Sequence, residues 1–327
     1  MTDRSKIVNR KAKIENPIWI DLHTHSTFSD GSMTPTELVA AARAAGLAAI
    51  ALTDHDTCDG LSEFLAAGKG SEVETLAGVE VSLEFGGRTV HMLGYGINTA
   101  HGRLRETLSR LVEGRNKRNT RIVQKLQLLG ISIELNEVQA IAGEQIVGRP
   151  HFAQVLIQKG VVGSFDEAFD RYLARGRPAY FERFRLSPEE AIHLIAEAGG
   201  MAVLAHPYYM GMASDLIAST LTRLKAAGLV GIEAYYPEHT EGQTRLYVEM
   251  AQRFDLLVTG GSDFHGTIKP NIALGWGRGS LRVPYVLFER LRKALLRRGK
   301  NGLVGQHSGS KHQVSGFKSQ VSGEDLP

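Results

Sequence analysis

Short apolar stretches that are typical of buried strands alternate with helical stretches over most of the chain. Residues Thr34, Pro35 and Glu37 predict one helix start, with Thr34 as the N-cap, Pro35 in the first turn and Glu37 completing a capping box. Two Gly residues at 86–87 separate a pair of strands and predict a hairpin. Alternating strands and helices predict an α/β fold with a mainly parallel sheet. The predicted strands cover residues 17–22, 47–56, 74–85, 88–96, 199–207, 229–237 and 256–266.

Residues 101–187 break this alternation. Leucine and isoleucine recur there at helical spacing, which predicts a helical insertion in the α/β domain. The last stretch of the chain is rich in Gly, Ser, Lys and Gln, and we expect it to be disordered. The predicted organisation is an N-terminal extension at 1–16, a barrel domain at 17–100 and 188–298, the helical insertion at 101–187, and a disordered tail at 299–327.

Composition narrows the class of protein. Hydrophobic residues make up 43% of the 327 residues and charged residues 22%, as in ordinary globular proteins. No apolar run is long enough to cross a bilayer and the N-terminus is polar, so we expect a cytoplasmic protein that does not bind membranes. The net charge of +3 is too small for nucleic-acid binding by the whole surface. Cys58 is the single cysteine, which excludes an intramolecular disulfide and a thiolate metal site.

Histidines and acids stand where the predicted strands end. His23 and His25 are two residues apart, so their side chains would point to the same side of a strand. An isolated pair of this kind would be read as surface histidines, but imidazoles or carboxylates also end most of the later strands. Active sites of α/β barrels lie at the carboxyl ends of strands. The pattern therefore predicts a metal site that uses His23, His25, Asp30, His55, Glu80, His91, His206, Asp263 and His265.

The number and type of these side chains limit how many metal ions the site can hold and which metals they can be. Nine ligands are too many for one or two ions with open positions, and they suit three divalent ions. Imidazole and carboxylate ligands without sulfur fit Mn, Fe, Zn or Mg, and Mn is our preferred prediction.

Six segments carry a resemblance to a known family. The sequences "DLHTHSTFSDGS", "ALTDHDT", "GVEVS", "VHMLGYG", "LAHP" and "GSDFHG" resemble the PHP (polymerase and histidinol phosphatase) family of metal-dependent phosphoesterases. The resemblance extends from about residue 17 to 296 and implies a distorted (β/α)7 barrel. Within the insertion, "RNKRNTRI" and "VGRPHFAQVL" are similar to bacterial nucleoside 3',5'-bisphosphate phosphatases, some of which also act as 5'-to-3' exoribonucleases.

The resemblance implies a distribution of the ligands over three ions. His23, His25, Glu80 and Asp263 would hold one, while Asp30, His55 and His265 would hold a second, with Asp30 and His55 near the substrate. His91 and His206 would join Glu80 on a third.

Three divalent ions with three carboxylates would leave a charge of about +3, which suits a phosphate group better than a neutral amide. The nucleophile would be a metal-bound hydroxide, so no Ser or Cys nucleophile is needed. Asp54 and Asp56 flank His55, and Asp54 is the better candidate to accept the second N–H of that ring. The alternative for either acid is a role in the turn.

The insertion is locally basic. Residues 101–125 contain eight Lys or Arg against two Glu, which could also be an ordinary solvated helix face. Arg115, Asn116, Arg118 and Asn119 form a compact cluster of anion donors. Arg149, beside Pro150 at a predicted helix start, is a further candidate for binding the substrate phosphate, and His239 could line the cleft.

These observations favour a metal-dependent phosphoric monoester hydrolase. It would convert nucleoside 3',5'-bisphosphates to 5'-monophosphates and phosphate, and would also act as a 5'-to-3' exoribonuclease on short 5'-phosphorylated RNA. Its partners would be nucleotide or short RNA substrates, with no obligate protein partner. A histidinol-phosphate phosphatase is an alternative, although such a small substrate needs no basic insertion. A non-catalytic nucleic-acid-binding PHP module is the other alternative.

Overall fold

The computed structural model describes residues 18–86, 88–142, 146–211 and 214–298. The predicted N-terminal extension and the predicted disordered tail both lie outside the described residues.

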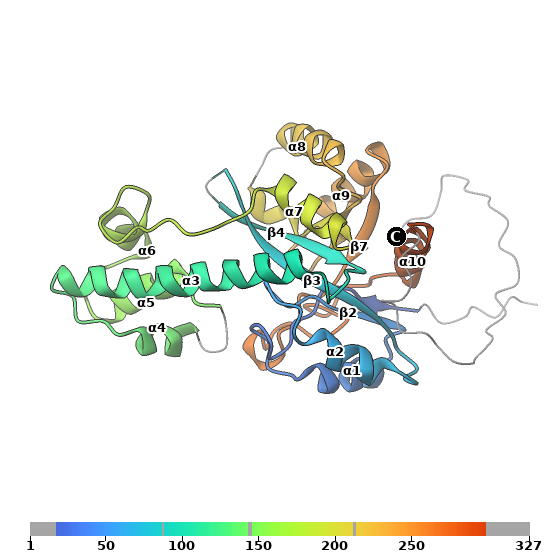
Figure 1. The fold of residues 1–327 in the computed structure, drawn as a ribbon, viewed down its shortest axis with the longest axis horizontal. Coiled ribbons are helices and arrows are strands. Elements are labelled where there is room, and N and C mark those ends of the chain that lie inside the picture. The colour runs from blue at the N-terminus through green and yellow to red at the C-terminus, as the bar shows by residue number, and fades with distance from the viewer. Residues whose placement is uncertain (1–17, 87, 143–145, 212–213, 299–327) are drawn as a thin grey trace, which may run out of the picture.

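Seven strands form one sheet that is nearly closed into a barrel (Figure 1). The first three strands are parallel, the fourth is antiparallel to both of its neighbours, and the last three are again parallel. The spatial order follows the chain: β1 Ile20–Asp21, β2 Ala49–Leu52, β3 Glu74–Phe85, β4 Arg88–Tyr95, β5 Met201–Leu204, β6 Gly231–Tyr235 and β7 Leu257–Gly260. The predicted hairpin is the β3–β4 pair, in which Phe85 lies opposite Arg88.

Backbone contacts bring the last strand next to the first. The N–H of Leu22 donates to the carbonyl of Gly260 at 3.1 Å, and the N–H of His25 donates to the carbonyl of Phe264 at 2.9 Å. This approach requires a residue without a side chain, because a Cβ on Gly261 would lie 2.3 Å from the backbone nitrogen of His23. The predicted distorted (β/α)7 barrel is confirmed.

Helices surround the sheet (Figure 1). They are α1 Pro35–Ala44, α2 Leu61–Gly68, α7 Pro188–Glu197, α8 Ser214–Ala226, α9 Glu241–Arg253 and α10 Tyr285–Arg297. The predicted capping box of α1 is present, since Thr34 accepts from the N–H of Glu37 and the Glu37 carboxylate accepts from the N–H of Thr34. No helix in the described part of the chain is long and apolar enough to cross a membrane.

The strands separate two apolar clusters, as the two-residue period of a strand requires. In β2, Ile50 and Leu52 belong to the cluster that includes α1, α2 and α7, whereas Ala49 and Ala51 belong to a second cluster that includes α10. All four side chains are buried, so β2 is covered on both faces.

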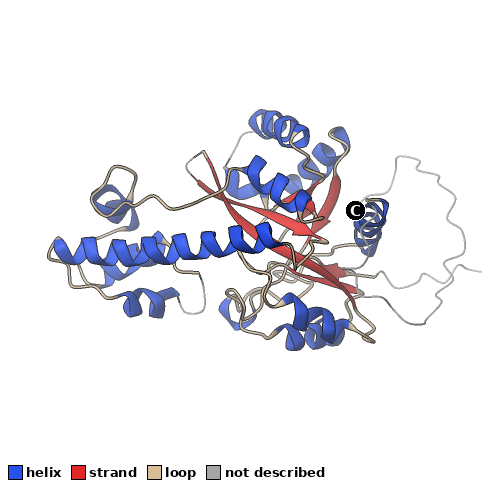
Figure 2. Cartoon of the chain, viewed as in Figure 1, coloured by secondary structure: helices blue, strands red, loops and turns tan. Residues whose placement is uncertain are grey.

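The insertion projects from one side of the barrel, and its regular elements within the described residues are all helical (Figure 2). They are α3 Gly102–Leu128, α4 Leu135–Ala142, α5 Arg149–Gln158, α6 Phe165–Ala168 and a π-helical turn at Phe169–Leu173. The long helix α3 links two cores, because Leu104 and Leu108 pack in the barrel cluster whereas Ile122 and Leu126 pack in a separate cluster of the insertion.

Candidate metal centre and arginine cavity

The structure brings the nine predicted ligand side chains together at one end of the barrel. Each comes from the end of a strand or from the loop that follows it, except Glu80 and His91, which lie within the long strands β3 and β4. The barrel thus delivers imidazoles and carboxylates from distant parts of the sequence to one place.

Glu80 lies at the middle of this group and is almost completely buried. Its Oε2 is 3.1 Å from Nε2 of His23, 3.3 Å from Nε2 of His25 and 3.2 Å from Nδ1 of His55. Its Oε1 is 2.9 Å from both Nδ1 of His91 and Nε2 of His206. Burial acts to raise the pKa of Glu80, but the surrounding imidazoles outweigh it and hold the pKa well below its usual value. The carboxylate is therefore ionised.

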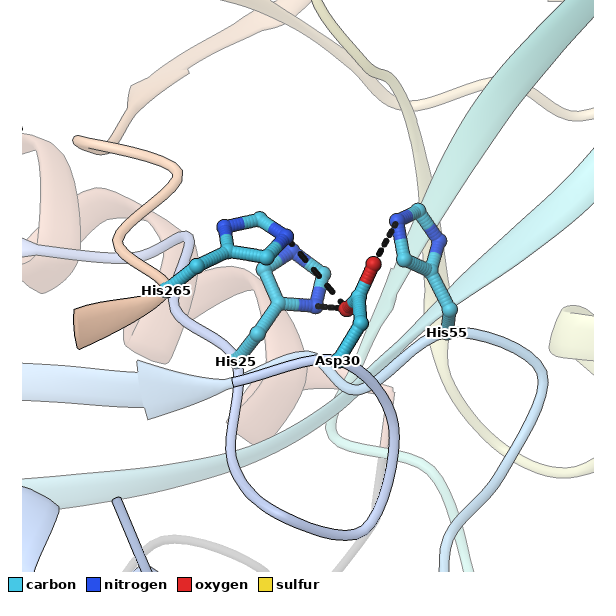
Figure 3. A group of neighbouring side chains, drawn as sticks. All are labelled: His25, Asp30, His55 and His265. Carbon is cyan, nitrogen blue, oxygen red and sulfur yellow. Dashed lines mark ion pairs between the residues drawn. The ribbon is translucent and has the colours of Figure 1, made fainter. Parts of the chain in front are cut away.

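Three groups of ligand atoms each lie within 4.8 Å of one another. Figure 3 shows one of them, in which the carboxylate of Asp30 faces the rings of His25, His55 and His265. The Asp30 oxygens are 3.6 Å from Nδ1 of His25, 4.0 Å from Nε2 of His55 and 3.3 Å from Nε2 of His265. The other two groups are His23, His25, Glu80 and Asp263, and His55, Glu80 and His91.

The donor atoms fit divalent metal ions. Both ring nitrogens of His25 and Nδ1 of His55 are buried and make no hydrogen bond within the described residues. Carboxylate oxygens lie 3.1 to 3.6 Å from these nitrogens without forming hydrogen bonds to them, and a metal ion would bind both the imidazoles and the carboxylates. The groups differ from the predicted distribution in two ways: His25 also joins the Asp30 group, and His55 stands in the third group where His206 was predicted. His206 stays beside Glu80, and its Nε2 is 3.3 Å from Nδ1 of His91.

Glu233 in β6 holds two of these histidines, and the sequence analysis missed it. Its Oε1 accepts from Nδ1 of His23 at 2.9 Å, which leaves Nε2 of that ring to face the centre. Its Oε2 accepts from the backbone N–H of His206 at 2.8 Å. The available signal was an acid inside the apolar stretch "VGIEAYY", because a buried strand carries a carboxylate only where it has partners.

Two further residues hold Asp263. The hydroxyl of Tyr236 donates to its Oδ2 at 2.9 Å, and Nζ of Lys269 lies 2.6 Å from the same oxygen. Burial acts to raise the pKa of Asp263, but Lys269 and the nearby histidines outweigh it and hold the pKa well below its usual value.

The backbone is strained at three residues of this region. His206 has a φ of 22°, and Asp56 and Asp263 each have a φ of 54°. Residues with side chains rarely adopt these left-handed conformations, and where they do the surroundings must enforce them. At His206 the backbone N–H donates to the buried carboxylate of Glu233.

The prediction for Asp54 needs correction. Its carboxylate accepts from the N–H of Ser26 at 2.7 Å and from the hydroxyls of Ser26 and Ser29, each at 2.6 Å, rather than from the ring of His55. Neighbouring residues of an extended chain point to opposite sides, which separates Asp54 from the adjacent ring. Asp54 instead holds the loop that carries Asp30.

A cavity of about 450 Å³ adjoins the ligands, and we call it the arginine cavity. It is lined by Asp30, His55, His91 and His265 from the centre and by five arginines: Arg115, Arg118, Arg149, Arg183 and Arg185. Arg115 is paired with Asp56, and Arg185 with Glu84. Arg183 has a buried Nε and Nη1 without a hydrogen-bond partner in the described residues.

The arginine cavity has an excess of positive charge. Burial and the neighbouring arginines lower the pKa of Arg118 to about 9 and that of Arg183 to about 10. Burial and repulsion thus both disfavour the charged forms, and a bound anion would relieve the repulsion. The sequence analysis missed Arg183 and Arg185, because they lie in an irregular segment about 70 residues beyond Arg115.

Comparison with known proteins identifies the family of this chain. The family model of the PHP domain matches residues 21–180. A 3',5'-nucleoside bisphosphate phosphatase of Chromobacterium violaceum is 38% identical over 247 residues, which cover 75% of this chain and 87% of that protein. The chain belongs to the PHP domain family. The predicted resemblance is thereby confirmed.

Two other known proteins are similar to this chain over most of their length. A 5'-3' exoribonuclease of Haemophilus influenzae is 36% identical over 245 residues, covering 75% of this chain and 89% of that protein. A Bifidobacterium adolescentis structure assigned as a metal-dependent phosphoesterase superposes with a TM-score of 0.66 at 30% identity, covering 86% of this chain and 97% of that chain. This PHP protein is accordingly a metal-dependent phosphoesterase.

Only some of the remaining predicted substrate residues of this PHP protein line the arginine cavity. Arg149 lines the arginine cavity and donates to the carbonyl of Leu173 at 3.1 Å. Asn119 holds Arg118, whose Nη2 donates to its Oδ1 at 2.8 Å. Asn116 is exposed on the outer face of α3, because the adjacent residue Arg115 faces the cavity and consecutive helical residues point about 100° apart. His239 lies beside Tyr236 and bonds the carbonyl of Ala234 at 2.8 Å, outside the lining of the described cavities.

Proposed function

We propose that this PHP enzyme removes the 3'-phosphate of nucleoside 3',5'-bisphosphates and releases nucleotides from the 5' end of short 5'-phosphorylated RNA. The observation that carries the proposal is the arginine cavity directly beside the metal ligands. A substrate with two phosphates can place one at the ligands and the other among the arginines. The names of the relatives from C. violaceum and H. influenzae support the same pair of reactions.

We further propose that the centre binds three divalent ions, with Mn²⁺ as the preferred metal. The nine predicted ligands would hold them, with Glu80 shared between groups. Bound ions would supply an activated water and would stabilise the charge on the phosphate. Glu233, Tyr236 and Lys269 would keep the ligands in position through their hydrogen bonds to His23 and Asp263.

In this proposal the arginines orient the substrate. Arg118 and Arg183 have the charge and the burial to bind the 5'-phosphate with charge-assisted hydrogen bonds. Once that phosphate is held, the 3'-phosphate lies at the ligands. Histidinol phosphate fits less well, because it has a single phosphate and an ammonium group that the five arginines would repel.

The test compares three substrates with Mn²⁺-loaded enzyme: adenosine 3',5'-bisphosphate, adenosine 3'-monophosphate and histidinol phosphate. We expect kcat/KM for the bisphosphate to exceed that for the 3'-monophosphate at least about ten-fold, which is the worth of one or two hydrogen bonds to a charged group. Arg183→Met should reduce this preference about ten-fold, mainly through KM for the bisphosphate. Equal turnover of the two nucleotides, or turnover of histidinol phosphate alone, would contradict the proposal.

A matched control is Arg175→Met, which removes an arginine whose side chain is 83% exposed in the same segment of the insertion. This variant should keep the wild-type preference for the bisphosphate. If both variants lose the preference equally, the effect comes from the net charge of the insertion and not from the cavity.

A further inference from the structure

A second cavity, of about 550 Å³, adjoins the metal ligands, and we call it the tyrosine cavity. It is lined by Glu80, His206 and Asp263 from the centre, together with Tyr209, Tyr236 and Arg88. The two cavities share His55, Thr89, His91, Arg149 and Lys269, whereas Asp30, His265 and the other four arginines line only the arginine cavity. The centre therefore lies between a cavity that contains five arginines and one that combines two tyrosines with Arg88, Arg149 and Lys269.

Of two adjacent exposed tyrosines, Tyr209 lines the tyrosine cavity and Tyr208 lies beside it, outside the lining. Tyr208 is 44% exposed and Tyr209 is 45% exposed, and their ring centroids are 5.3 Å apart. Both lie in the 3-10 helix η2, Pro207–Met210, which begins directly after His206. The ring of Tyr209 is 5.1 Å from that of His206, so the aromatic surface starts at a predicted metal ligand.

Exposed aromatic rings beside a phosphate site are the usual means of holding a single-stranded nucleic acid. Every base has a flat face that stacks on such rings, so the contact tolerates different sequences. Sequence-independent stacking would suit an enzyme that removes nucleotides one after another. The nearby cation Arg88 would suit a following phosphate group.

We propose that Tyr208 and Tyr209 stack the base of the second nucleotide of a short RNA substrate. This inference rests on the proposed function, since it takes the first 5'-phosphate to lie in the arginine cavity and the scissile phosphate at the ligands. Water then adds its OH to phosphorus, and the bond from phosphorus to the 3'-oxygen of the first nucleotide breaks. That oxygen takes the proton, the first nucleotide leaves as a 5'-monophosphate, and the phosphate stays on the second nucleotide.

The direction in which the RNA substrate runs through the site follows from these placements. The first nucleotide occupies the arginine side of the centre, so the second nucleotide must continue away from it. The adjoining open space that is lined by aromatic rings is the tyrosine cavity. A nucleoside bisphosphate ends at the scissile phosphate and has no second base, so it does not use this surface.

The experiment uses the full-length Mn²⁺-loaded enzyme and two substrates, adenosine 3',5'-bisphosphate and a 5'-phosphorylated adenosine trinucleotide. Tyr208 is the residue to change, because its described ring contacts are with Tyr209 and His239 and not with a ligand. For Tyr208→Ala we expect the ratio of kcat/KM for the trinucleotide to kcat/KM for the bisphosphate to fall at least about five-fold, mainly through KM. Tyr208→Phe should keep most of the ratio, since it retains the stacking ring.

The matched control is Phe165→Ala, which removes an aromatic ring that is 46% exposed on the insertion, and it should leave the ratio unchanged. An unchanged ratio in Tyr208→Ala, or an equal fall in both activities, overturns the inference. Wild-type enzyme that cleaves the bisphosphate but not the trinucleotide also overturns it while the phosphatase proposal stands. Wild-type enzyme that cleaves neither substrate refutes both.

Discussion

Glu80 shows how a single residue can organise the centre. Its two oxygens face five imidazoles, those of His23, His25, His55, His91 and His206. A buried carboxylate is stable only when it is paired, and here the pairing groups are themselves candidate metal ligands. The charge of Glu80 and the arrangement of the histidines therefore depend on each other.

Glu233 bonds His23 and His206 through nitrogens that do not face Glu80, so we predict that metal binding depends on Glu233. Glu233→Gln removes the charge that orients the ring of His23 and weakens the contact with the N–H of His206. We expect metal affinity to fall about 10- to 100-fold, as is usual when a partner of a ligating histidine is changed. Calorimetric titration of the metal-free protein with Mn²⁺ measures the affinity. Glu241→Gln, on an exposed acid, serves as the control, and equal affinities in both variants would refute the role of Glu233.

Some residues of the site could be predicted from the sequence, and others could not. Histidines and acids after apolar strands are visible because a strand end fixes where a side chain points. Glu233 was missed because one acid inside an apolar stretch has many explanations. Asp54 was assigned to the wrong partner, because whether it bonds His55 or the Ser26–Ser29 loop depends on loop geometry that has no periodic signal.

Helix α1 is an element whose start is specified locally. Thr34→Ala removes the hydroxyl that accepts from the N–H of Glu37 and should lower the free energy of unfolding by about 1 kcal/mol. Urea unfolding followed by circular dichroism measures the change. As a control, Thr222→Ala changes an exposed threonine inside α8 and should have little effect. If the two variants are equally stable, the cap does not contribute.

The elements themselves were largely predictable, for physical reasons that differ along the chain. Strand β2 is apolar throughout because helices or strands cover both of its faces, and this composition is visible in the sequence. The hairpin of β3 and β4 was signalled by two glycines. In contrast, the segment after the π-helical turn has no periodic pattern, so nothing in the sequence indicates that Arg183 and Arg185 return to α3.

At the scale of the whole molecule, the arginine cavity joins the insertion to the barrel. Arg115 and Arg118 come from α3, Arg149 begins α5, and His55 belongs to the barrel. Helix α3 is packed in both apolar cores, so it carries its arginines to the ligands on a rigid element. An anion in this cavity would contact residues of both parts and would offset the repulsion among the arginines.

Inorganic phosphate should therefore stabilise the metal-free protein. A ligand that binds only the folded state at about 100 times its Kd adds about 2.7 kcal/mol to the free energy of unfolding, so the melting temperature should rise with phosphate concentration. Thermal unfolding in the presence of a chelator measures this rise, and sodium chloride at equal ionic strength controls for general screening of charge. Arg183 repels Arg118 and helps to lower its pKa, and a bound phosphate would offset this repulsion. Arg183→Met removes the repulsion and should therefore reduce the rise in melting temperature with phosphate. Arg175→Met, at an exposed position, should not reduce it. An equal rise with chloride, or an equal response of both variants, would mean that screening at the surface and not the arginine cavity stabilises the fold.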